Sequence, residues 1–141
     1  MATEPVTGGC FCGALRYRIG QVDQVANCHC SMCRRTSGAP FVSWLVVPRN
    51  HFAYTQGTPT HLKSSPRGDR YFCATCGTPV ACVVENQPDH IDITLGSLDH
   101  PEAFTPAIDV HKRSRLHWVP HLVEVKPVPQ AGEPEPPLAK Q

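Results

Sequence analysis

The sequence predicts a mainly β domain of short strands, with few short helical turns. The 141 residues include 15 prolines and 10 glycines, a content that favours turns and leaves little room for long helices. Several segments also alternate apolar and polar side chains with the period of two that is typical of a half-buried strand. A chain of this length corresponds to one domain with a single modest core.

Alternation is clearest in two of the predicted strands. In residues 14–19, Leu15, Tyr17 and Ile19 share one face, and two arginines share the other. Residues 90–95 alternate in the same way, with Asp92 in the middle of the polar face. Further short strands, bounded by Pro, Gly or Asn, are predicted at residues 41–47, 71–73, 79–84, 107–111 and 121–125.

Helical turns are predicted at residues 31–37, and at residues 97–104 with Ser97 as the capping residue. Residues 126–141 hold five prolines and almost no aliphatic side chains, which predicts an extended or disordered tail. The chain therefore divides into a domain at residues 1–125 and a Pro-rich flexible tail at residues 126–141.

The overall composition argues against several functions. A formal net charge of +1 provides no broad basic face for nucleic acid and no acidic tail. No segment approaches the roughly 20 apolar residues of a membrane span. The first residues lack the basic and apolar regions of a signal peptide, so we expect a cytoplasmic protein with no membrane or nucleic-acid partner. In that reducing compartment, cysteines are better explained as metal ligands or reactive thiols than as disulfides. The oligomeric state stays open.

Seven of the eight cysteines fall into three clusters. The clusters contain two, three and two cysteines: Cys10 and Cys12; Cys28, Cys30 and Cys33; Cys73 and Cys76. These numbers suggest one closed four-thiolate metal site and one site with only three protein ligands. Structural zinc is usually four-coordinate, whereas catalytic zinc keeps one position open for water or substrate. Spacing alone does not decide which clusters share a metal.

The two outer pairs have the spacing of a closed site. Cys10 and Cys12 are two residues apart, so on an extended segment both thiols point the same way. Cys73 and Cys76 have the spacing of a zinc knuckle, and a glycine follows each pair, as a tight knuckle turn requires. Tetrahedral sulfurs at a Zn–S distance of about 2.3 Å lie under ~4 Å apart, which both pairs can reach. Four thiolates would also suit iron.

The middle cluster places three cysteines within six residues. Three thiolates on Zn²⁺ leave a formal charge of −1, which makes a poor Lewis acid. The natural task of such a site is to bind and activate a fourth, exogenous thiolate. Two alternatives stay open: a second structural site completed by a ligand such as His29, His51, His111 or water, or a redox dithiol at Cys30 and Cys33.

The residues around the cysteines carry a family resemblance. The relevant segments are Gly8-Gly9-Cys10-Phe11-Cys12-Gly13, Leu15-Arg16-Tyr17, Cys28-His29-Cys30-Ser31-Met32-Cys33-Arg34-Arg35, Gly38-Ala39-Pro40-Phe41, Trp44, Phe72-Cys73-Ala74-Thr75-Cys76-Gly77-Thr78, Gly96-Ser97-Leu98-Asp99 and Trp118. In this order they closely resemble the glutathione-dependent formaldehyde-activating enzyme family, over roughly residues 8–120.

The resemblance implies an Mss4-like fold of short coiled antiparallel sheets stapled by zinc. It implies two zinc ions per chain: a structural one on Cys10, Cys12, Cys73 and Cys76, and a catalytic one on Cys28, Cys30 and Cys33. The implied activity is that of a carbon–sulfur lyase, which joins glutathione and formaldehyde into S-hydroxymethylglutathione or catalyses the reverse reaction. The implied partner is a small glutathione-like thiol, held by zinc next to the carbonyl carbon.

Other residues near the middle cluster admit two interpretations. Arg34 and Arg35 directly follow it and could bind a substrate carboxylate, or they could form a solvated surface pair. Cys82, in an apolar segment, is interpreted as a buried thiol with no metal role. The competing hypothesis for the whole chain is a non-enzymatic binding module in which both zinc sites are structural.

Overall fold

The computed structural model describes residues 4–120, which fold mainly into short strands. The strands are β1 (Val6–Gly9), β2 (Arg16–Ile19), β3 (Gln24–Cys28), β4 (Val42–Pro48), β5 (Phe52–Gln56), β6 (Thr60–Ser65), β7 (Gly68–Phe72), β8 (Pro79–Val84), β9 (His90–Thr94) and β10 (Ile108–Val110). The helical elements are α1 (Ser31–Ser37) and the short 3₁₀ helices η1 (Arg49–His51), η2 (Leu95–Ser97), η3 (Pro101–Ala103) and η4 (Lys112–Ser114). The predicted mainly β fold class is thus confirmed.

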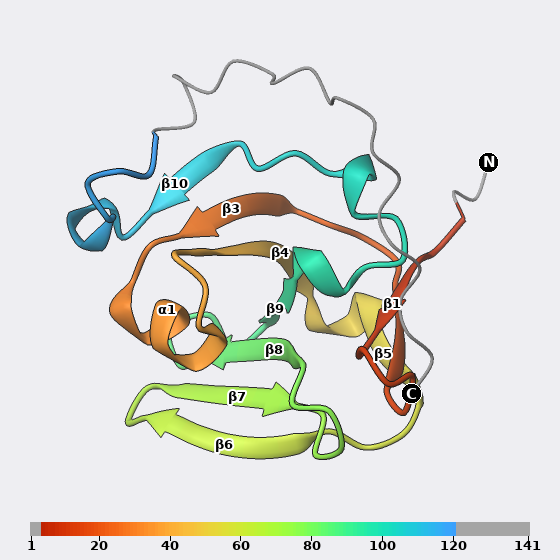
Figure 1. Ribbon diagram of the computed structural model, residues 1–141. Coiled ribbons are helices and arrows are strands. Elements are labelled where there is room, and N and C mark those ends of the chain that lie inside the picture. Colours follow the sequence, from red (N-terminus) through yellow and green to blue (C-terminus); the bar gives the residue numbers. More distant parts are fainter. Residues whose placement is uncertain (1–3, 121–141) are drawn as a thin grey trace, which may run out of the picture.

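The strands form two sheets. The smaller has the order β1-β2-β5 and the larger the order β10-β3-β4-β9-β8-β7-β6. Figure 1 shows β10 and β6 at opposite edges of the larger sheet, with α1 at the left of the view and the smaller sheet at the right. All neighbouring strands are antiparallel except β10, which runs parallel to β3. A parallel neighbour needs a long connection, and here the chain returns to β3 only after six other strands.

The core lies between the two sheets. Tyr17 and Ile19 of β2 are buried, as the alternation in residues 14–19 predicts, while Arg18 between them is exposed. They belong to the same apolar cluster as Leu45 of β4 and Ile93 of β9, both fully buried. Burying each such side chain stabilises the fold by about 1.5–3 kcal/mol. The opposite face of the larger sheet does not contribute to this core.

Most predicted elements occur close to their expected positions. Residues 31–37 form α1 and residues 79–84 form β8, as predicted, whereas the strand expected at 71–73 is the C-terminal end of β7. Of the helical segment expected at residues 97–104, only the short 3₁₀ helix η3 occurs, and η2 precedes it. Ser97 ends η2 and does not cap a helix, since its hydroxyl bonds the hydroxyl of Tyr17 at 2.7 Å and the carbonyl of Thr94 at 2.9 Å.

Some expectations concern segments that the structure does not describe. The strand predicted at residues 121–125 and the tail predicted at residues 126–141 lie outside the described residues. Within residues 4–120, no helix is both long and apolar enough to cross a membrane.

Candidate metal centres

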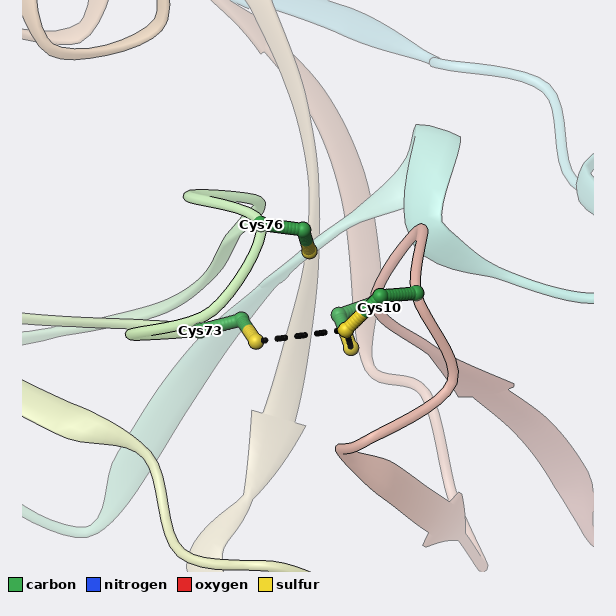
Figure 2. Close-up of side chains that lie close together, drawn as sticks. Cys10, Cys73 and Cys76 are labelled. Carbon is green, nitrogen blue, oxygen red and sulfur yellow. Dashed lines mark hydrogen bonds between the residues drawn. The ribbon is translucent and has the colours of Figure 1, made fainter. Parts of the chain in front are cut away.

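The two outer cysteine pairs meet in one four-cysteine group, Cys10, Cys12, Cys73 and Cys76. Their sulfur atoms all lie within 4.8 Å of one another. Cys10 and Cys12 lie in the turn between β1 and β2, and Cys73 and Cys76 in the turn between β7 and β8. Figure 2 shows the side chains of Cys10, Cys73 and Cys76 pointing toward one another from these two turns.

The geometry of the four-cysteine group fits a tetrahedral metal ion. The sulfur of Cys12 lies 3.6 Å from that of Cys10 and 3.7 Å from that of Cys73. Sulfurs bound tetrahedrally at a Zn–S distance of about 2.3 Å would be about 3.8 Å apart. At Cys73, a hydrogen bond from the backbone N–H of Cys76 lowers the pKa and favours the thiolate. Gly13 and Gly77, one after each pair, have φ angles of 81° and 79°, as a knuckle turn requires.

The middle cluster forms a separate three-cysteine group. The sulfurs of Cys28, Cys30 and Cys33 lie within 4.8 Å of one another. Cys28 ends β3, Cys30 caps α1, and Cys33 lies in the first turn of that helix. The Cys30 sulfur accepts a hydrogen bond of 3.2 Å from the backbone N–H of Cys33. This strand-to-helix turn supplies all three sulfurs from one short segment of the chain.

Strand β10 holds the segment that carries these sulfurs. Its residue Val110 pairs with Cys28, and the Val110 carbonyl accepts the backbone N–H of His29 at 3.1 Å. The His29 ring is buried, and its Nε2 lies 2.8 Å from Oδ1 of Asp109. His29 therefore connects the turn to β10 and does not add a ligand atom to the three-cysteine group.

The three-cysteine group opens into a cavity of about 630 Å³. All seven strands of the larger sheet contribute to its lining, and the lining residues of the five central strands lie on the face opposite the core. The lining residues from these strands are Gln24, Ala26 and Cys28; Trp44 and Val46; Gly68 and Arg70; Cys82 and Val84; and Asp92. The four-cysteine group does not line this cavity. Of the two groups, only the three-cysteine group is accessible to a small molecule from the cavity.

A row of three side chains crosses the cavity floor. Arg70 of β7 pairs with Cys82 of β8, and Cys82 pairs with Asp92 of β9. The Arg70 Nη2 donates a hydrogen bond of 3.5 Å to the sulfur of Cys33. Burial raises the pKa of Asp92 to about 6, and the nearby negative charge of Cys33 adds to this effect. Burial likewise raises the pKa of Cys82 to about 11, so that its thiol stays neutral.

Charge in the three-cysteine group is centred on Cys33. A hydrogen bond from the Cys28 thiol lowers the pKa of Cys33 to about 5, against the opposing effect of burial, and the Arg70 guanidinium contributes in the same direction. The pKa of Cys28 is correspondingly raised, because it keeps the shared proton. The group thus has one ready thiolate before any metal binds.

The remaining candidates from the sequence occupy other positions. Arg34 and Arg35 lie on α1 and are not among the residues that line the cavity, so a role in substrate binding stays a prediction. His111 lines the cavity but does not belong to the three-cysteine group. His51 belongs neither to the cavity lining nor to the group. No histidine or carboxylate in residues 4–120 adds a fourth ligand atom to that group.

The fold and the two cysteine groups define a small β protein with a four-cysteine and a three-cysteine group, each of which could hold a metal ion. The chain matches the model of the glutathione-dependent formaldehyde-activating enzyme family over residues 5–114, and it belongs to this family. Its fold is similar to that in a crystal structure of a Rhodobacter sphaeroides protein, with a TM-score of 0.61 and 20% sequence identity. The match covers 73% of this chain and 98% of that chain.

Proposed function

We propose that this protein is a zinc-dependent enzyme of the carbon–sulfur lyase type, acting on glutathione or a similar thiol and a small carbonyl such as formaldehyde. The observation that carries the proposal is the contrast between the two cysteine groups. Four sulfurs complete one group, whereas the other has three sulfurs and opens into a cavity. An incomplete ligand set beside a cavity is the arrangement of a catalytic metal site.

Each group would hold one metal ion. Cys10, Cys12, Cys73 and Cys76 would hold a structural zinc, and Cys28, Cys30 and Cys33 a second zinc. Zinc bound to the three-cysteine group would supply a coordination position for the substrate thiol and lower the pKa of that thiol. The cavity volume of about 630 Å³ lies within the range of about 300–1,000 Å³ typical of small-molecule sites.

The proposed reaction is an addition and requires no oxidant or reductant. The thiol gives up its proton, its sulfur forms a bond with the carbonyl carbon as the C=O π bond opens, and the oxygen takes up a proton, so that atoms and charge balance. The reverse reaction breaks the same carbon–sulfur bond. The cavity walls hold the two reactants together, so that a bimolecular reaction in solution becomes an effectively unimolecular one in the cavity. Asp92 lines the cavity with a pKa of about 6, so its Oδ can exchange the proton that the oxygen gains or loses.

Cobalt substitution tests the thiol-binding step directly. The reduced protein is loaded with cobalt(II), and its visible spectrum is recorded with glutathione and, as a matched control, with S-methylglutathione, which has no thiol. We expect glutathione alone to change the bands of the second cobalt and to protect Cys28, Cys30 and Cys33 from alkylation. If glutathione changes neither the spectrum nor the alkylation, the proposed thiol substrate is wrong.

Metal content and exchange kinetics test the rest of the proposal. We expect two zinc ions per chain in a reduced sample, and one would favour a structural binding module. Exchange of free and hydroxymethylated glutathione, measured by NMR exchange spectroscopy with formaldehyde present, should be faster with the protein than without it. The Cys30→Ser variant should lose this acceleration, whereas Cys82→Ala, which changes the same cavity without removing a ligand, should retain it.

A further inference from the structure

Arg70 lies at the junction of the cavity and the three-cysteine group. It is half-buried on β7 and lines the cavity beside Cys82. Among residues 4–120, the Cys33 sulfur is the one hydrogen-bond acceptor of its guanidinium, at 3.5 Å from Nη2. The guanidinium is therefore held against a candidate metal ligand and not against a carboxylate.

The charge of a loaded three-cysteine group calls for a neighbouring cation. Three thiolates and a divalent ion carry a net charge of −1, and a fourth thiolate from a substrate would bring this to −2. Such charge is costly in a partly buried site unless a nearby cation offsets it. Asp92 adds to the negative charge of the cavity, and Arg67, Glu85 and His111 lie on its exposed parts. Arg70 is the cationic side chain among residues 4–120 that donates to a sulfur of this group.

We propose that Arg70 is the positioning residue of the three-cysteine group, offsetting its negative charge and holding the Cys33 sulfur toward the bound metal. The inference rests on the proposed function, because it assigns a metal to Cys28, Cys30 and Cys33. It also gives the cavity a preference for anionic thiols, since the guanidinium reduces the repulsion between three ligand thiolates and an incoming fourth. Arg34 and Arg35 are not needed for this role.

The four-cysteine group fixes the strand that carries Arg70. β7 ends at Phe72, and Cys73 is the next residue, so only two residues lie between Arg70 and a cysteine of the other group. In the turn after β7, the Cys73 sulfur contacts the sulfur of Cys12, which lies 61 residues earlier in the chain. Metal binding at the four-cysteine group therefore restrains the position from which Arg70 reaches Cys33.

Cobalt(II) titration of the reduced, metal-free full chain tests the role of Arg70. The variants are Arg70→Gln, which removes the charge, and Arg70→Lys, which keeps it. Arg67→Gln is the matched control, because Arg67 lines the same cavity but is exposed and donates to no sulfur. We expect Arg70→Gln to weaken binding of the second cobalt by about 10- to 100-fold, the usual effect of losing a partner of a metal ligand. Arg70→Lys should stay within a few-fold of wild type, and Arg67→Gln should bind like wild type.

The outcomes separate the inference from the proposed function. Equal affinity of Arg70→Gln and wild type for the second cobalt would overturn the inference. The Arg70→Gln variant could lose cobalt binding at both groups together with its folded circular dichroism spectrum. In that case, the side-chain ¹⁵N signals of Arg70 in the wild-type protein test the proposed role of Arg70. The second equivalent of zinc should shift these signals and slow their proton exchange, and unchanged signals would overturn the role. A second cobalt that depends on Arg70 but ignores glutathione would support the inference and contradict the proposed thiol substrate.

Discussion

Arg16 and Asp99, which are 83 positions apart in the sequence, form a bidentate ion pair. The Arg16 Nη1 donates to Oδ1 of Asp99 at 2.9 Å, and Nη2 donates to Oδ2. The hydroxyl of Thr7 donates to the same Oδ2 at 2.6 Å. These bonds fasten the hairpin of β1 and β2 to the segment after η2. They also lower the pKa of Asp99 to about 2, with the Arg16 hydrogen bonds as the main cause.

Replacing Asp99 by Asn should reduce stability at neutral pH only modestly. The carboxylate is about one-third exposed, so we expect a loss of about 0.5–1 kcal/mol in the free energy of unfolding. Because the folded-state pKa is depressed, this contribution is complete above the unfolded value near 4 and disappears as the pH falls toward 2. Thermal unfolding of both proteins, from pH 7 down to the lowest pH at which they fold, should show the difference shrinking. A gap that widens on acidification would contradict the assignment.

Replacing Asp92 by Asn should stabilise the protein above pH 6. The folded-state pKa of Asp92 is raised to about 6, so ionisation in the folded state costs free energy. Wild-type stability from this group is complete below the unfolded pKa near 4 and is lost as the pH rises through 6. The variant avoids the loss and should gain roughly 1–3 kcal/mol at pH 8, since each pKa unit corresponds to about 1.4 kcal/mol.

The check is the unfolding midpoint of both proteins between pH 4.5 and pH 8. The two midpoints should approach each other toward pH 4, separate as the pH rises from 4 to 6, and keep a constant difference from there to pH 8. A variant that is less stable than wild type at pH 8 would show that Asp92 has a compensating partner. The same variant should be slower in glutathione exchange, because it has no titratable oxygen at this position.

Cysteine substitutions in the two groups should have different consequences. Cys73→Ser should unfold the domain, because a structural metal site contributes on the order of 10 kcal/mol, comparable with the total stability of about 5–15 kcal/mol. Cys30→Ser should keep the fold and bind about one zinc ion fewer. Circular dichroism and metal analysis of the two purified variants provide the comparison. A folded Cys73→Ser protein with both metals would contradict the structural role of the four-cysteine group.

Cys82 should behave as an unreactive apolar thiol. Burial raises its pKa to about 11, so the thiolate needed for alkylation is scarce at pH 8. Mass spectrometry of the zinc-loaded protein after iodoacetamide treatment should show Cys82 unmodified, and the same treatment in denaturant should modify it. Labelling of native Cys82 at the rate measured in denaturant would show that its thiol is accessible and ionised.

Strand prediction from the sequence worked most clearly where one face alone is buried. The alternation in residues 14–19 and 90–95 corresponds to β2 and β9, whose apolar faces meet in the core. β3 was missed because Gln24–Cys28 is buried on both sides and does not alternate. β6 was missed because Thr60–Ser65 is an edge strand with few apolar residues. β1 (Val6–Gly9) and β5 (Phe52–Gln56) were missed as well, so four of the described strands were not predicted.

The candidate site was predictable only as far as its cysteines. Their spacing predicted that the sulfurs within each cluster lie close in space, and the family resemblance implied which clusters share a site. Asp92 was visible as the polar face of an alternating strand, but such a face normally meets solvent and here it lines a cavity. Arg70 carried no local signal, because its place beside Cys33 depends on how β7, β8 and β9 align.

The two cysteine groups differ in how much chain must exist before each can form. Cys28, Cys30 and Cys33 lie within six residues, so their sulfurs can gather around an ion as soon as the chain has passed residue 33. The other group must close a loop of 61 residues between Cys12 and Cys73, which costs more entropy and must wait until residue 76 is made. During synthesis, the ligands of the three-cysteine group are therefore all present before those of the four-cysteine group, whereas β10, which supports the three-cysteine turn, is made later than both.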